Sequence, residues 1–451
     1  MKPTCWVVAA VALGTLAVPT VAVADEPKIT YETFTLKNGL HVFVIEDHKA
    51  PIVNEVLWFN VGSKDEQPKR TGFAHLFEHL MFKGSAHIAD GQMDKLLEEA
   101  GGWSNAFTSS DMTVYQNVAA SNFLEAVLWG EGDRVAGLID TFDQAKLDNQ
   151  RDVVLNERRQ SYENRPYGMS ELLILDALWP ANFGYHWSTI GYVPDLKAAA
   201  VPDVAAFFKT YYVPNNATLV LAGDVTLAQA RPLVEKYLGF IPAAATPARP
   251  KYATPPPLTK EVVLTATDDV QVPKVFLTWR APAKYSADEA ALDLATMVLA
   301  GGKSSRLYKR LVYDDKIAQD AEGGESGEML AGTVQLEVTA KPGTDPAALV
   351  KAVNEEVAKL AATGPTAEEV ERVQASHESG FLYGLESTLQ KAITLAGYDV
   401  QAKDPAYFAK DLARYRAVTA AQIKAAAATY LKPTSRVTLT IKPGKKQKET
   451  K

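Results

Sequence analysis

The sequence has almost no cysteine, since Cys5 is the single one among 451 residues. A disulfide-stabilised scaffold is therefore excluded. It also lacks a basic excess: 47 Lys and Arg stand against 54 Asp and Glu, for a net charge of −7. Nucleic-acid-binding proteins usually show the opposite balance. Beyond the first 24 residues there is no apolar run long enough to span a membrane.

What is present is the composition of a large folded protein. The 47% hydrophobic and 22% charged residues are ordinary proportions, which argue against disordered, collagen-like and coiled-coil proteins. At roughly 150 residues per domain, the length predicts two to four domains.

The first 24 residues have the features of an export signal. Lys2 gives a positive start, residues 7–23 are uncharged and mostly apolar, and residues 22–24 form an Ala-Val-Ala cleavage site. A membrane anchor is the alternative, but the small residues and the A-x-A end favour a signal peptide cleaved after Ala24. Because Cys5 lies inside it, the mature chain would contain no cysteine, which suits an oxidising compartment. We therefore expect an exported, periplasmic protein.

Two stretches about 220 positions apart share one plan of strand, polar turn and helix. They comprise residues 53–61, 62–70 and 71–82 in the first, and residues 274–280, 281–286 and 287–299 in the second. Further segments with strand or helix patterns alternate along both parts, so the fold class is predicted to be α+β.

The boundary between the two parts is marked by proline. Residues 241–258 are dense in Pro and Ala, which is typical of an extended, semi-rigid linker. We expect an N-terminal half over residues 25–240 and a C-terminal half over 259–442. The lysine-rich residues 443–451 are expected to form a frayed, solvated tail.

The chemically informative stretch is residues 72–84, GFAHLFEHLMFKG. On a helix, one face carries an apolar stripe made of Phe73, Leu76, Phe77, Leu80 and Met81. His75, Glu78 and His79 fall together on the opposite face. The two imidazoles lie one turn apart, close enough to bind one metal ion.

Zinc hydrolases use this combination of residues. Two neutral imidazoles and a carboxylate hold the ion and leave one position for a water molecule, whose pKa falls toward roughly 7. His75 and His79 fit the ligand role, and Glu78 fits the general base that takes the proton. A solvated face or hydrogen-bonded core groups are the alternative, but three suitable residue types at metal spacing, in the H-x-x-E-H pattern, favour a catalytic site.

Residues 72–84, 101–108 and 153–159 resemble the inverzincin family, which includes pitrilysin, insulinase and the mitochondrial processing peptidase. The resemblance covers nearly the whole mature chain. It implies two homologous α/β-roll halves, each with a mixed, mainly antiparallel sheet and packed helices, closed as a clamshell around a chamber. It further implies one Zn²⁺ per chain and peptide substrates.

The resemblance also assigns further site residues. A third zinc ligand is implied on a separate helix, where Glu157 occupies the matching place. Glu163 competes with it but lies close to Pro166, where the helix must end. The residues that match the family's substrate-binding edge strand are Asn105, Ala106, Phe107 and Thr108. Such an edge can bind an extended peptide as an added strand, whereas an edge blunted by Ser and Asp is the alternative.

Two departures from the family pattern stand out. Gln150 occupies a position where relatives often carry a glutamate beside the site, so any assisting charge there is lost and a hydrogen bond remains possible. In the C-terminal half, Val312 and Gln319 stand where active single-chain relatives place a substrate-binding Arg and Tyr. Arg306 and Tyr308 lie nearby at the wrong spacing.

These departures suggest half of a divided enzyme. The processing-peptidase branch uses two homologous subunits, one with zinc and one supplying complementary residues. We expect an exported zinc metalloendopeptidase that is the zinc-bearing subunit of a heterodimer, its paralogous partner supplying the Arg/Tyr pair. A non-catalytic structural or peptide-binding subunit is the main alternative, and a hydrolase of non-peptide amides a weaker one. The isolated His186 and His377 are expected to be structural.

Overall fold

The computed structural model describes residues 28–446. The expected signal peptide and the last five residues of the expected tail lie outside this range. Within it, no helix has both the length and the apolar character needed to cross a membrane. The helices are α1 Phe73–Leu80, α2 Gln92–Glu99, α3 Leu124–Gly137, α4 Gln144–Arg158, α5 Ser170–Leu178, α6 Val193–Ala198, α7 Val201–Tyr211, α8 Leu227–Leu238, α9 Glu289–Ala300, α10 Arg306–Tyr308, α11 Pro346–Thr363, α12 Ala367–Tyr383, α13 Thr388–Gly397, α14 Tyr407–Arg416 and α15 Ala420–Tyr430.

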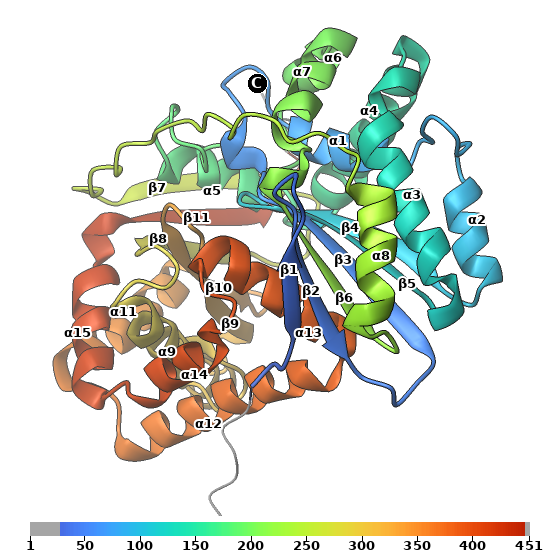
Figure 1. Ribbon diagram of the computed structural model, residues 1–451. Coiled ribbons are helices and arrows are strands. Elements are labelled where there is room, and N and C mark those ends of the chain that lie inside the picture. The colour runs from blue at the N-terminus through green and yellow to red at the C-terminus, as the bar shows by residue number, and fades with distance from the viewer. Residues whose placement is uncertain (1–27, 447–451) are drawn as a thin grey trace, which may run out of the picture.

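Two mixed β-sheets form the centres of two halves (Figure 1). The first has the order β1-β2-β6-β3-β5-β4, and the second β7-β11-β8-β10-β9. In each, one pair of strands is parallel and the others are antiparallel. The strands are β1 Glu32–Thr35, β2 His41–Glu46, β3 Ile52–Phe59, β4 Trp103–Thr108, β5 Thr113–Ala120, β6 Ala217–Gly223, β7 Val262–Asp268, β8 Lys274–Ala281, β9 Ala318–Ser326, β10 Gly332–Ala340 and β11 Arg436–Pro443.

The second sheet repeats the first without β1. Each of its strands has a counterpart in the same spatial place, with β4 and β9 as the corresponding edges. The predicted α+β class with two similarly built halves is therefore confirmed. The clamshell arrangement is confirmed as well, because solved structures of the same architecture share it.

Local sequence explains the elements that were predicted. In β3, all residues after Ile52 are buried, because one face meets the helices of its own half and the other meets α13. Thr366 and Thr419 each form a capping box with the Glu or Gln three residues later, a pattern that the sequence shows directly. The strands β5 and β9 were not predicted. Polar Gln116 and Asn117 interrupt the pattern of β5, and β9 contains a Gly-Gly pair.

The two halves exchange one helix each (Figure 1). Helix α5 belongs to the first half by sequence but packs on the second sheet, where Leu178 shares a cluster with Phe276 and Leu439. Helix α13 belongs to the second half but packs on the first sheet, where Leu395 contacts the cluster of Trp58 and Val220. The two helices stand about 220 positions apart, the same spacing as the sequence repeat. Each sheet is thus covered on one face by a helix from the other half.

The segment between the halves has no regular secondary structure and is hydrogen-bonded to the first half. Residues 242–258 contain neither helix nor strand. Arg249 donates through Nη1 to Asp65 Oδ1 at 2.8 Å, and the hydroxyl of Tyr252 donates to the carbonyl of Lys64 at 2.6 Å. These bonds fix the proline-rich segment along the first half.

The described part of the expected tail is also bound. Strand β11 extends to Pro443, and the Gly444 amide donates to the Asp268 carbonyl at 2.9 Å. Lys446 Nζ lies 3.2 Å from Asp268 Oδ1 and donates to the Arg165 carbonyl at 3.0 Å. Residues 444–446 are therefore held by the fold rather than frayed, which differs from the expectation for this part of the tail.

Candidate metal centre

Helix α1 is held firmly on its apolar side. Phe77 stacks on Phe208 of α7 with ring centroids 5.0 Å apart, and Leu76 and Leu80 are buried. Gly72 precedes the helix at φ +83° and has no side chain that could cap it. The cap comes instead from Glu66, whose carboxylate accepts hydrogen bonds from the backbone amides of Gly72 at 2.9 Å and Ala74 at 2.7 Å. The opposite face of α1 is thereby presented at a fixed angle.

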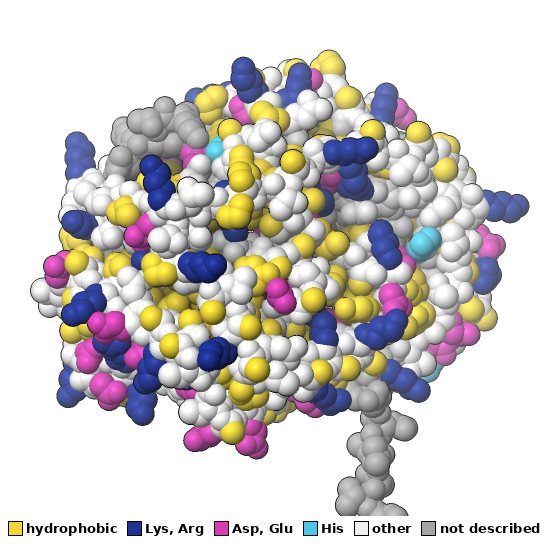
Figure 2. Space-filling model, turned by 90° about the vertical axis from the view of Figure 1, so that its left-hand side faces the viewer, with side chains coloured by type: hydrophobic (Ala, Val, Ile, Leu, Met, Phe, Trp, Pro, Cys, Tyr) yellow, Lys and Arg dark blue, Asp and Glu magenta, His cyan; other side chains and the backbone are white. Residues whose placement is uncertain are grey.

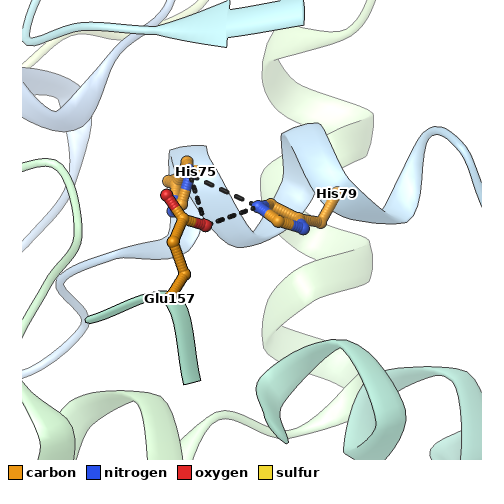
Figure 3. Close-up of side chains that lie close together, drawn as sticks. All are labelled: His75, His79 and Glu157. Atoms are coloured by element: carbon orange, nitrogen blue, oxygen red, sulfur yellow. Dashed lines mark hydrogen bonds and ion pairs between the residues drawn. The ribbon is translucent and has the colours of Figure 1, made fainter. Parts of the chain in front are cut away.

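Three side chains converge on that face, as Figure 3 shows. The Nε2 atoms of His75 and His79 lie 3.3 Å apart, and Glu157 Oε2 from α4 lies 3.6 Å from the first and 3.2 Å from the second. Among residues 28–446, these three form the only group of this kind whose ligand atoms all lie within 4.8 Å of one another. The predicted third residue is therefore brought to the two histidines from a distant helix.

The spacing fits a tetrahedral zinc ion. With metal–ligand bonds of about 2.0–2.1 Å, two ligands of a tetrahedral site lie about 3.3–3.4 Å apart. The three observed separations, 3.2, 3.3 and 3.6 Å, bracket this value. The two imidazole nitrogens and the carboxylate oxygen lie close enough for one cation to contact all three. The donor set therefore fits zinc.

The charge states also suit a metal ion. Burial lowers the pKa of His75 to about 4, with the nearby His79 contributing and Glu157 opposing, so the imidazole is neutral at pH 7. The hydrogen bond with His79 lowers the pKa of Glu157, which keeps it ionised. Metal binding requires neutral histidine and charged carboxylate, so the shifts of His75 and Glu157 both favour it.

Glu78 lies on the same face but is not part of the three-residue group. The hydroxyl of Thr108 donates to its Oε2 at 2.5 Å. Burial raises the pKa of Glu78, which the Thr108 hydrogen bond partly opposes. A half-buried carboxylate beside, but outside, the metal ligands has the placement of a general base.

The rival ligand Glu163 is engaged elsewhere. Helix α4 passes at Arg159 into a π-turn that ends at Glu163. There the carboxylate accepts a bond from Arg158 Nη1 at 2.7 Å, and this guanidinium is almost fully buried. The geometry therefore favours Glu157 over Glu163.

The matching edge-strand residues lie in β4, which is the outermost strand of the first sheet. Ala106 packs in the core beside α1, whereas Phe107 packs with the α13 cluster on the opposite face. Asn105 is exposed, and Thr108 reaches Glu78. The edge lies beside the histidine helix, so a peptide added to β4 would run past the cluster.

Other predicted residues have ordinary surroundings. Gln150 is buried and donates to the Asn149 side chain at 2.6 Å. Arg306 donates two hydrogen bonds to the carboxylate of Glu369, and the ring of Tyr308 contacts that of Tyr313. The residues at the expected Arg and Tyr positions lie in a π-turn, Lys309–Asp314, and at the start of β9.

The two isolated histidines make structural contacts. His186 Nδ1 lies 2.9 Å from the Trp179 carbonyl, and its Nε2 lies 3.5 Å from Asp176. The ring of His377 stacks on Tyr415 with centroids 3.5 Å apart. Neither belongs to a metal-binding group in the described part of the chain.

A cavity of about 500 Å³ lies between the halves, next to the segment that follows Glu157. Its wall combines Tyr162 and Glu171 from the first half with Phe276, Glu328 and Gln335 from the second. The two halves therefore leave a partly open cavity between them.

Sequence reasoning missed Glu66 and the side-chain role of Thr108. The missing cap at Gly72 signals that some distant acceptor must bind the amides of α1. The sequence cannot say which acceptor, because that depends on the path of the loop over residues 62–71.

Matches to two models of one protein family cover most of both halves. The first half matches the family described as insulinase, peptidase family M16, over residues 41–183. Residues 200–376 match the description "peptidase M16 inactive domain". The chain belongs to the M16 family.

Relatives of known name cover most of the chain. Zinc protease PqqE of Helicobacter pylori (strain ATCC 700392 / 26695) is 28% identical over 379 residues, 82% of this chain and 84% of that protein. The crystal structure of a protease from Helicobacter pylori has a TM-score of 0.86 at 27% identity, covering 92% of this chain and all of that one. The periplasmic protease PqqL from Escherichia coli has a TM-score of 0.75 at 19% identity, and 92% of this chain matches 48% of that chain.

Proposed function

We propose that the chain is an exported zinc metalloendopeptidase that cleaves peptides or unfolded polypeptides. The observation that carries the proposal is the convergence of His75, His79 and Glu157 at tetrahedral zinc spacing, beside an unligated Glu78. Periplasmic localisation is supported by the signal-like residues 1–24. The relative from Escherichia coli, which is described as periplasmic, shares the fold.

The roles follow from the contacts of each residue. A zinc ion held by His75, His79 and Glu157 would supply Lewis acidity for water and for the scissile carbonyl. Glu78 takes the proton of the attacking water and passes it to the leaving amine. The open edge of β4 aligns an extended peptide through its backbone, which gives affinity with little sequence preference.

A paralogous partner subunit is the second part of the proposal. Val312 and Gln319 occupy the places of the expected Arg and Tyr, and Arg306 is engaged by Glu369. The Escherichia coli relative is about twice as long, and the structure of its first half alone covers 92% of this chain. We propose that this chain forms a heterodimer whose partner supplies the Arg/Tyr pair. Full peptidase activity of the purified monomer would contradict it.

The test compares zinc content and peptide cleavage in matched variants, with and without the partner. Glu78→Gln should keep one zinc per chain and lose cleavage by roughly 10²–10⁴-fold, because only the proton-transfer group changes. His79→Ala should lose both zinc and cleavage. A wild-type complex that binds zinc but cleaves no unfolded polypeptide would instead support the non-catalytic peptide-binding subunit.

A further inference from the structure

Thr108 is the last residue of β4 and links that edge strand to the base. Successive side chains of a strand point to opposite faces. Ala106 packs with the α1 cluster and Phe107 with the α13 cluster, so Thr108 faces α1. Its hydroxyl reaches Glu78 Oε2 at 2.5 Å.

The position of this hydroxyl is set by the sheet rather than by the side chain alone. Thr108 pairs in register with Thr113 of β5, and their hydroxyl oxygens lie 3.4 Å apart. Thr113 donates in turn to the Val61 carbonyl at 3.0 Å. A β-branched side chain has restricted χ1 freedom, so the donor aimed at Glu78 is well fixed.

The other carboxylate oxygen of Glu78 is left available. In the described part of the chain, Oε2 receives the Thr108 bond and Oε1 receives none. A glutamate side chain otherwise has several rotamers of similar energy. Anchoring one oxygen therefore holds the second in one place for proton transfer.

We propose that Thr108 is a positioning residue for the general base Glu78, and that it aligns the base with the peptide-binding edge of β4. This inference rests on the proposed function. Because the backbone of Thr108 belongs to the strand and its hydroxyl holds the carboxylate, a peptide added to β4 is placed in register with the base. The family resemblance groups Thr108 with the substrate-binding residues; in this proposal its backbone keeps that role and its hydroxyl serves the base.

The test uses Thr108→Val, which keeps the shape and removes the hydroxyl, and Thr108→Ser, which keeps the hydroxyl. We expect Thr108→Val to bind zinc like the wild type, to lose kcat by about 10–100-fold, and to change KM by less than about twofold. Thr108→Ser should recover most of kcat. In a Glu78→Gln background, Thr108→Val should cause no further loss.

Three outcomes would overturn the inference. They are an unchanged kcat in Thr108→Val, a rise in KM without loss of kcat, and failure of Thr108→Ser to recover activity. A crystal structure of Thr108→Val gives a readout independent of activity. Displaced or multiple Glu78 conformers support the inference, and a single unchanged conformer contradicts it. If the wild type binds zinc but is inactive, the proposed function fails while this structural readout still decides the inference.

Discussion

Burial and neighbouring charges together set the charge state of Glu328. Glu328 lies in the segment between β9 and β10, where it faces Asp111, Lys64 and Glu171 and accepts a bond from Ser110. Burial, followed by the repulsion of Asp111, raises its pKa to about 7. The next residues bind the first half: the amide of Met329 donates to Asp111 Oδ2 at 2.9 Å. A titrating carboxyl group therefore lies at the contact between the halves.

This position predicts a pH-dependent stability. Below pH 4.5 Glu328 is protonated in both the folded and unfolded states and carries no penalty. As the pH rises to about 7, the unfolded chain ionises first, so the free energy of unfolding falls by roughly 3 kcal/mol. Glu328→Gln should therefore match the wild type near pH 4.5 and exceed its stability at pH 8, as measured by urea unfolding at both pH values.

Glu371→Gln, on an exposed part of α12, is the matched control for that substitution. It should leave the difference in stability between the two pH values as in the wild type. An equal pH dependence in Glu328→Gln and the wild type would show that Glu328 does not titrate in this range.

At the scale of single elements, α1 shows how a short helix is held in place. Eight residues are too few for independent stability, so tertiary contacts must fix it. The apolar stripe packs on α7 and the first sheet, and the carboxylate of Glu66 binds the amides at the start of the helix. Both contacts determine the direction in which His75 and His79 point.

Removing the cap should therefore affect stability and zinc together. Glu66→Ala leaves the amides of Gly72 and Ala74 buried without acceptors, which should cost about 2 kcal/mol in the free energy of unfolding. We also expect weaker zinc binding, measured by competition with a chelator. Glu98→Ala, on the exposed side of α2, should change neither quantity. A Glu66→Ala variant with wild-type stability would contradict the capping role.

Elements with a strong local signal could be predicted from sequence, and elements defined by distant contacts could not. The H-x-x-E-H stripe predicted α1 because polar and apolar faces separate at helical spacing. Strand β9 was missed because its Gly-Gly pair and acidic residues are unfavourable in a strand, and pairing with β10 overrides that preference. For the site, spacing was enough for His75 and His79. Only the family resemblance selected Glu157, because nothing local places α4 against α1.

At the scale of the whole molecule, the exchange of α5 and α13 binds the halves to each other. The face of the first sheet that carries Trp58 and Val220 is covered by α13 from the second half. Without it, a continuous apolar surface would be exposed to water. The sequence repeat predicted two halves, but it could not reveal the exchange, because helix patterns do not specify which sheet a helix covers.

On the face of the molecule shown in Figure 2, charge is evenly distributed, because Lys and Arg are interspersed with Asp and Glu. This agrees with the small net charge of −7.

The exchange predicts that the linker is not needed to keep the halves together. A protease site inserted between Ala245 and Thr246, which are exposed, should allow the chain to be cut without separating the fragments. Gel filtration of the cut protein should give one peak at the size of the uncut chain, and thermal unfolding should remain a single transition. Separate elution of the two fragments would contradict this account.

The most direct test of the central claim is the zinc affinity of Glu157→Gln compared with Glu163→Gln, measured by isothermal titration of the metal-free proteins. The structure places the Glu157 carboxylate 3.2 Å from His79 and pairs Glu163 with Arg158. We predict one zinc per chain in the wild type and in Glu163→Gln, and an affinity reduced by about 100-fold or more in Glu157→Gln. Unchanged zinc affinity in Glu157→Gln, or loss of zinc from Glu163→Gln, would contradict the proposed metal centre.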